Sequence, residues 1–260
     1  MAAEPGVGLV AGPGFVLEVD GGLLALASSR VFSRSFEIPR SQSPRLRVVR
    51  RREESPLPTP MSSSVFEGGS YRLSDGLLEF VIPENPFAAE AALRIAWHAA
   101  TLETGGLLLH ASGVSFGGVA VVAPGQSGDG KSTLATLCVR HTSAQLLSDE
   151  IIQVFPDGMC AGTPFRSNCP IPGAPCQSRV GLLVKLAKGA EERLEPIAPT
   201  EAFTWLMQAT YESEPGGLSP GEKARRVMQL LSVVMPRRLT FRNDPVVGTF
   251  LSERLDPRRV

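Results

Sequence analysis

The first third of the chain alternates short apolar runs with Gly, Pro and Ser, as strands and their turns do. The runs are FVLEV, LLALA and RLRVV, followed by YRLSDGLLEFVI, in which Asp75-Gly76 separates two strand-like pieces of a hairpin. We therefore predict a β-rich N-terminal region over residues 1–84. An arginine-rich stretch within it is expected to be a solvated strand edge, with docking of an acidic partner as the alternative. Its arginines are Arg45, Arg47, Arg50, Arg51 and Arg52.

From Glu84 onward the apolar residues take the spacing of a helix. Asn85 is suited to cap this helix, Pro86 to occupy its first position, and Gly105-Gly106 to end it. Nearer the C-terminus the same signals predict three shorter helices, of which the second opens with a capping-box sequence. These helices are expected to begin after Thr200, at Ser219-Pro220-Gly221-Glu222 and at Asp244-Pro245.

The strongest chemical signal is the sequence GQSGDGKS, which fits G-x-x-x-x-G-K-[ST] and lies between the apolar run VAVVA and the helical sequence TLATLCV. Glycines let backbone N–H groups converge on phosphate oxygens, and the helix N-terminus adds its positive dipole. Lys131 would neutralise the outer phosphates and Ser132 would ligate Mg²⁺. A carboxylate here repels phosphate, so we expect Asp129 to point outward. The predicted nucleotide-binding residues are Gly125, Gln126, Ser127, Gly128, Asp129, Gly130, Lys131, Ser132 and Thr133.

An acidic pair, Asp149 and Glu150, follows the next apolar strand in LLSDEIIQV. A helix of about 11 residues, rising about 1.5 Å per residue, is expected to return this strand beside the loop strand and to bring both carboxylates near the Mg²⁺ position. One acid would hold the ion and the other would accept a proton from the attacking hydroxyl. We assign Asp149 as the proton acceptor and Glu150, with Ser132, as a metal ligand, and the sequence leaves the exchange of these two roles open.

A histidine is predicted to stand at the mouth of the same site. LLLHASGVSF and VAVVAPG resemble two antiparallel strands joined by the two-residue turn Gly117-Gly118. A turn this tight pairs Phe116 with Val119 and His110 with Gly125. Directly opposed Cβ atoms lie about 4.5 to 5.5 Å apart. A catalytic role for the imidazole therefore stands beside the alternative of a packed, hydrogen-bonded histidine.

Charge and composition narrow the class of protein. The 26 basic and 26 acidic side chains give a net charge of zero, which supplies no broad positive field for nucleic acid. No apolar run reaches the roughly 18 to 20 residues of a membrane span, and the first residues lack a basic signal region, so we expect a cytoplasmic protein without membrane contact. The four cysteines form no CxxC pair and are interpreted as ordinary thiols rather than zinc ligands.

A histidine-bearing strand before a GxSGxGKS loop, with an acidic pair after the next strand, resembles the catalytic domain of HPr kinase/phosphorylase and its shorter relatives. The family motif looks like H-G … G-D-S-G-x-G-K-S … D-D, with Glu150 here in place of the second Asp. The resemblance implies a phosphoenolpyruvate-carboxykinase-like P-loop fold and a serine kinase that uses ATP and Mg²⁺. It also implies that the first acid accepts the proton and that the histidine helps to handle the phosphate. The matching residues are His110, Gly125, Ser127, Gly128, Gly130, Lys131, Ser132 and Asp149.

The resemblance does not cover the whole chain. The family's downstream E-x-R-G-x-G-I-I segment has no counterpart, with Arg179 as the nearest candidate, so neither phosphorylase activity nor HPr as substrate follows. The sequence GLSPGEKARR resembles an ABC ATPase signature, but no Glu follows Asp244 and no histidine follows His141 to act as that family's switch. The pattern of this segment is also fully explained by a capped helix.

Together these patterns predict an α/β protein with the β-rich region at 1–84 and a P-loop kinase-like domain with a helical C-terminal part at 85–260. The predicted activity is transfer of the γ-phosphoryl group of ATP to a hydroxyl, with a serine of a protein or peptide as acceptor and residues 156–175 among the recognition loops. Asp149, His110 and Lys131 are the predicted catalytic residues. The alternatives are a small-molecule kinase, or an ATPase or nucleotide-binding module without protein-kinase activity. A homo-oligomer is left open.

Overall fold

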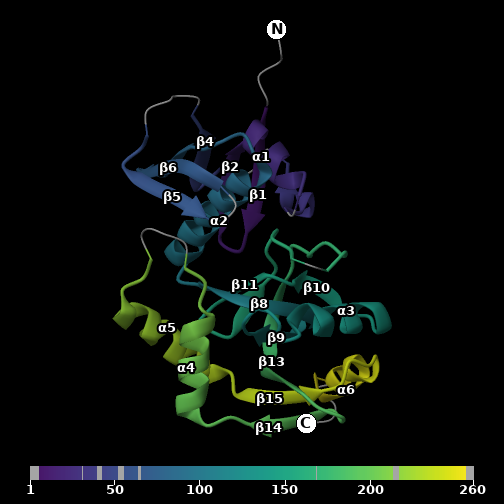
Figure 1. Ribbon diagram of the computed structural model, residues 1–260. Helices are drawn as coiled ribbons and strands as arrows, with labels where there is room; N and C mark the ends of the chain where they lie inside the picture. The colour runs from purple at the N-terminus through teal and green to yellow at the C-terminus, as the bar shows by residue number, and fades with distance from the viewer. Residues whose placement is uncertain are drawn as a thin grey trace. The chain divides into compact units, whose positions relative to one another are not determined.

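Two β-sheets and six α-helices make up the described part of the computed structural model, which is a mixed α/β protein (Figure 1). The structure describes residues 6–30, 32–39, 43–51, 56–63, 66–167, 169–212 and 217–255. The chain divides into two compact units, Met1–Thr104 with Glu212–Gly217, and Gly105–Tyr211 with Leu218–Val260. Each unit contains one of the sheets.

The first unit is built on a seven-stranded sheet of order β3-β1-β2-β4-β7-β6-β5. The predicted hairpin at Asp75-Gly76 is confirmed, since Ser74 pairs with Leu77 and both turn residues have positive φ, 43° and 74°. The strands are β1 (Val7–Gly12), β2 (Phe15–Asp20), β3 (Glu37–Ile38), β4 (Leu46–Arg50), β5 (Thr59–Ser63), β6 (Phe66–Ser74) and β7 (Leu77–Val81).

One of the predicted strand-like runs, LLALA, is instead part of helix α1 (Gly21–Ser28). Asp20 caps this helix, because its Oδ1 accepts a hydrogen bond from the Leu23 N–H at 2.9 Å. Leu and Ala have high helix propensity, and with a cap in place this local preference wins over the strand-like pattern of short apolar runs.

The arginine-rich stretch is also placed differently from the prediction. Strand β4 lies between β2 and β7, so it is an interior strand and not a sheet edge. Its arginines are engaged within the unit, as Arg47 pairs with Glu18 at 3.3 Å and Arg51 with Glu79 at 3.2 Å. Arg52 lies outside the described residues.

The long helix α2 (Pro86–Glu103) begins and ends as predicted, with Asn85 as its cap and Gly105 beyond its end in the left-handed region. It contacts β2, β4 and β6 of the first sheet. Trp97 on its inner face is fully buried and meets the ring of Phe15 edge-on, with the ring centroids 5.0 Å apart. Helix α2 therefore completes the first unit, and the division lies after Thr104 rather than after residue 84 because the apolar face of the helix is buried on this sheet.

The second unit is built on an eight-stranded sheet in which five strands pair in a closed circuit, β8-β9-β13-β12-β11 and back to β8. Helices α4 and α5 pack against one apolar core of this unit, and α3 and α6 against the other. The strands are β8 (Leu107–Phe116), β9 (Val119–Pro124), β10 (Gln145–Ser148), β11 (Ile151–Val154), β12 (Met159–Ala161), β13 (Gln177–Lys188), β14 (Arg193–Pro196) and β15 (Pro236–Phe241).

The predicted C-terminal helices are confirmed. They are α4 (Pro199–Ala209), α5 (Pro220–Val233) and α6 (Val246–Leu255). Ser219 caps α5 through a bond from the Glu222 N–H at 3.2 Å, and the Asp244 carboxylate accepts a bond from the Val246 N–H at 3.0 Å. No helix in the described part of the chain is long and apolar enough to cross a membrane.

Asn85→Ala tests the cap of α2. Asn85 Oδ1 accepts hydrogen bonds from the N–H groups of Phe87 and Ala88 at 2.9 and 3.0 Å. Alanine leaves both amides without this partner, so we expect a loss of about 1 kcal/mol of unfolding free energy, measured by urea denaturation. Asn85→Asp, which keeps the acceptor, should stay close to wild type. A loss as large for Asp as for Ala would contradict the role of the cap.

Candidate functional site

The candidate site begins where strand β9 passes through a glycine loop (residues 125–130) into helix α3 (Lys131–His141). Gly128 and Gly130 have φ values of 90° and 95°, a region that only glycine adopts without strain. Helix α3 has no side-chain cap at its N-terminus. Its first amides therefore remain directed outward as potential donors to an anion.

The predicted hairpin before the loop is confirmed in its register. Gly117 and Gly118 both have positive φ, Phe116 pairs with Val119, and Ala111 pairs with Pro124. One step further along, the Gly125 N–H donates to the His110 carbonyl oxygen at 3.0 Å. The backbone of His110 is thus fixed directly opposite the first residue of the glycine loop.

The acidic pair reaches the site by a different route from the predicted one. Strand β10 pairs with β8 and not with the loop strand β9, which occupies the opposite edge of β8. The chain turns at Asp149 and Glu150 into β11, which also pairs with β8, so that Ile151 lies opposite His110. The acids therefore come to the site across β8, because the edge of β9 away from β8 is occupied by β13.

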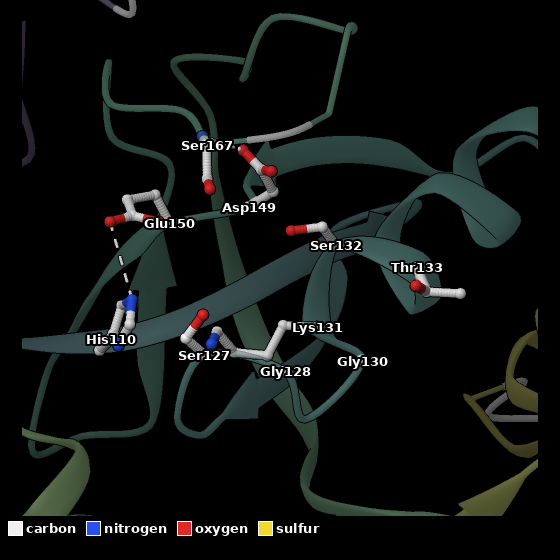
Figure 2. Close-up of a pocket in the computed structure, with 10 residues that line it drawn as sticks. All are labelled: His110, Ser127, Gly128, Gly130, Lys131, Ser132, Thr133, Asp149, Glu150 and Ser167. Atoms are coloured by element: carbon white, nitrogen blue, oxygen red, sulfur yellow. Dashed lines mark hydrogen bonds and ion pairs between the residues drawn. The ribbon is translucent and has the colours of Figure 1, made fainter.

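These elements enclose a pocket of about 410 Å³, within the range of ligand sites. Figure 2 shows the acids on one side of it and the glycine loop with Lys131 on the other. Gly125, Gln126 and Asp129, which were predicted to bind nucleotide, do not line the pocket. The lining residues are His110, Ser127, Gly128, Gly130, Lys131, Ser132, Thr133, Asp149, Glu150 and Ser167.

Ser167 is the lining residue that sequence reasoning missed. It lies within residues 156–175, the stretch assigned to acceptor recognition, but no motif marks the position itself. Asp149 brings it to the pocket, since its Oδ1 accepts a hydrogen bond from the Ser167 N–H and its Oδ2 one from the Cys169 N–H, each at 2.8 Å. Asp149 is only 1% exposed. Its carboxylate therefore serves to hold this loop, whatever else it does.

Glu150 faces the histidine. Its Oε1 lies 3.7 Å from His110 Nε2, and both side chains are partly open to solvent, at 22% and 32% (Figure 2). The Glu150 carbonyl oxygen also accepts a hydrogen bond from the Ala111 N–H at 3.1 Å, which fixes the backbone of the acid beside the histidine strand. The carboxylate and the imidazole are thus close enough to act on the same proton.

Lys131 is a buried cation that points into the loop, with 7% of its surface exposed. Its Nζ donates to the Gln126 carbonyl oxygen at 2.7 Å. Burial lowers the pKa of Lys131, and the neighbouring carboxylates of Glu150, Asp129 and Asp149 partly counteract that shift. Burial thus outweighs the three carboxylates in setting the pKa of this lysine.

The Asp129 carboxylate was predicted to point outward, but it instead bonds back to the glycine loop. Its Oδ2 accepts a hydrogen bond from the Gln126 N–H at 2.7 Å and so folds back on the glycine loop. A Cβ at Gly125 would stand 2.5 Å from the same oxygen, so a side chain at that position would displace the Asp129 carboxylate. Asp129 thus stabilises the bend of the loop and withdraws one amide from any bound anion.

The four cysteines are not among the residues that line the pocket. All four are free, and burial raises the pKa of Cys138 and Cys160 to about 12, which keeps both thiols protonated at neutral pH. Within the described ranges, no three His, Cys, Asp or Glu side chains gather into a metal site of their own.

Comparisons with known proteins add little to this geometry. No protein-family model matches the chain, and no curated protein sequence matches it. Among solved structures, the chain is similar to the HPr(Ser) kinase/phosphatase from Coxiella burnetii, with a TM-score of 0.27 and 15% sequence identity over 58% of this chain and 95% of that one. This is a weak similarity at the level of the fold, and it carries no conclusion about activity.

Asp149→Asn tests the hold on the Ser167 loop. Asparagine keeps one acceptor oxygen and loses the other, so one of the two loop amides loses its partner. A hydrogen bond to a charged group contributes about 1.5 to 3 kcal/mol, and we expect amide hydrogen exchange at Ser167 or Cys169 to become faster by on the order of tenfold. Glu150→Gln is the matched control and should leave both amides unchanged. Unchanged exchange in Asp149→Asn would show that the loop is held by other contacts.

Lys131→Met tests the cost of burying this cation. The lowered pKa means that desolvation disfavours the charged lysine, so at neutral pH the variant should melt at the same temperature as the ligand-free wild type or higher. As pH rises from the lowered pKa towards 10.5, the folded protein has already lost a proton that the unfolded chain keeps, and the wild type gains stability relative to the variant. Thermal unfolding at neutral pH and just below pH 10.5 measures both effects. A clearly lower melting temperature for the variant at neutral pH would contradict them.

Proposed function

We propose that this protein binds ATP with Mg²⁺ in the pocket at the glycine loop and transfers the γ-phosphoryl group to a hydroxyl. The acceptor class that the motif resemblance implies is a serine of a protein or peptide. The observation that carries the proposal is the buried Lys131 beside an uncapped helix N-terminus, in one pocket with a histidine and two carboxylates.

The residues present fit a nucleotide phosphate chain. Gly128, Gly130 and the first amides of α3 offer backbone donors, and the Lys131 ammonium offers a positive charge. Bound phosphate would supply the counter-charge that restores the lysine's ordinary pKa. Thr133 and Ser127 add hydroxyls on the same side of the pocket.

The donor set also fits a magnesium ion carried by the nucleotide. Magnesium takes hard oxygen ligands and in such sites needs only one or two from the protein, because phosphates and waters provide the others. Ser132 and one of the two acids would hold it, and the ion would offset charge on the phosphates. A site made of three protein carboxylates or imidazoles is not required.

The two acids differ in what they are free to do. Asp149, our candidate proton acceptor from the sequence, has each oxygen bonded to a loop amide, whereas Glu150 faces His110 with part of its surface open. Contacts therefore support the exchanged assignment, with Glu150 receiving the hydroxyl proton and Asp149 facing the metal. His110 would stand beside the proton acceptor and the transferred phosphate. The protein would mostly position the reacting groups and neutralise the charge on the phosphates, as phosphoryl transfer requires.

Nucleotide binding tests the proposal first. Titration calorimetry with Mg·ATP should show binding to the wild type and weakening by on the order of a hundredfold, about 2.7 kcal/mol, in Lys131→Met. Lys185→Met is the matched control, because Lys185 belongs to the same unit, pairs with Glu201 at 2.9 Å and does not line the pocket, so binding should be unchanged. No binding to the wild type, or equal loss in both variants, would refute the proposed site.

The acceptor is identified with labelled ATP and a lysate of the protein's own host, followed by mass spectrometry. A labelled phosphoserine peptide that disappears with Lys131→Met supports the proposed protein kinase. A labelled metabolite would instead assign a small-molecule kinase, and free phosphate alone an ATPase.

A further inference from the structure

The wall of the pocket opposite the glycine loop belongs to the loop segment that contains Thr163, Phe165, Ser167 and Gly173. This segment is anchored to the residues around the acidic pair. The Ser148 hydroxyl donates to the Phe165 carbonyl oxygen at 2.7 Å, and the Thr163 hydroxyl donates to the Ile151 carbonyl oxygen at 2.6 Å. At Gly173 a Cβ would stand 2.4 Å from the Leu147 carbonyl oxygen, so the later part of this loop segment packs directly on β10. The segment is thus bonded to both strands that flank the acids.

Ser167 lies at the point where this segment meets the pocket. The two bonds to Asp149 hold the backbone at Ser167 itself and at Cys169, two residues further on. Its side chain points into the pocket between Asp149 and Glu150, on the side away from Lys131 and Ser127 (Figure 2). The structure therefore holds a hydroxyl of this chain on the side from which an acceptor would approach.

We propose that Ser167 is itself a phosphate acceptor, so that the protein phosphorylates its own loop in cis. This inference rests on the proposed kinase function. The Ser167 O–H bond breaks and its oxygen forms a bond to the γ-phosphorus of ATP. The bond from that phosphorus to the bridging oxygen breaks, ADP leaves with its electron pair, and the proton passes to the Glu150 carboxylate.

The other hydroxyls of the pocket are placed less well for this reaction. Ser127, Ser132 and Thr133 belong to the glycine loop and the start of α3, the elements that would hold the phosphates from the leaving-group side. Phosphoryl transfer requires the attacking and leaving oxygens to be roughly in line on opposite sides of phosphorus. Ser167 lies on the facing wall, the side on which an attacking oxygen would stand.

Phosphorylation would change the contacts that hold the loop. A phosphoserine carries about −1.5 to −2 charges, and here it would stand beside two carboxylates. Repulsion should weaken the hold of Asp149, so the Cys169 amide should exchange faster in the phosphorylated protein. Phosphorylation would thereby loosen the loop at Ser167 and Cys169 from Asp149.

The experiment incubates the purified full chain with Mg·ATP and no added acceptor, and locates the phosphate by intact mass and peptide mapping. We expect one phosphoryl group on Ser167, absent in Ser167→Ala and in Lys131→Met. Ser143→Ala is the matched control, as Ser143 is an exposed serine of the same unit that does not line the pocket, and it should be phosphorylated like the wild type. A reaction in cis should also proceed at the same fractional rate after tenfold dilution of the protein.

The outcomes separate this inference from the proposed function. Calorimetric binding of Mg·ATP, or transfer to a lysate acceptor, with Ser167 unmodified would overturn the inference and leave the function standing. A rate that falls with dilution, or phosphate on another residue with Ser167→Ala unaffected, would overturn it as well. Absence of any nucleotide binding would overturn both. Faster exchange of the Cys169 amide in the phosphorylated protein is a further supporting readout.

Discussion

The site depends on one strand, β8, being paired along both edges. On one edge β9 continues into the glycine loop, and on the other β10 and β11 flank the acidic pair. His110 lies on β8 itself, so the position of its backbone relative to the loop and the acids is set by the hydrogen bonds of the sheet. A strand inside a sheet is among the most rigid supports a protein can give a side chain, and rigidity of this kind is what a site for charged ligands requires.

A buried cation is the second feature of the pocket. Lys131 is buried, the three neighbouring carboxylates only partly offset the lowering of its pKa by desolvation, and the nearby helix terminus has no side-chain cap. An arrangement like this disfavours the charged lysine in the free protein and becomes favourable when an anion enters. Binding sites often hold such unfavourable groups, since the contacts that would relieve them are supplied by the ligand.

The two acids, adjacent in sequence, are separated by their surroundings. Asp149 is buried and tied to the loop that carries Ser167, while Glu150 lies beside His110 at the edge of the pocket. Adjacent residues in a turn project in different directions, so one carboxylate can organise the wall of a site while the other faces its interior. This division of roles ties the shape of the acceptor side to the acidic pair, and it is the basis of both proposals made for the site.

Local chemistry in the sequence determined the elements that interact with their neighbours along the chain. The Gly117-Gly118 turn set the hairpin register, capping residues set the starts of α2, α5 and α6, and the glycine motif set a loop between a strand and a helix. The tertiary structure decided the pairing partners of strands: β10 beside β8, β4 inside its sheet, and Ser167 at the pocket. Turns and caps are held by hydrogen bonds between residues only a few positions apart, so the sequence alone predicts them. The choice of a sheet edge, and the bonds of Asp149 to a loop 18 to 20 residues away, depend instead on the burial of the whole unit.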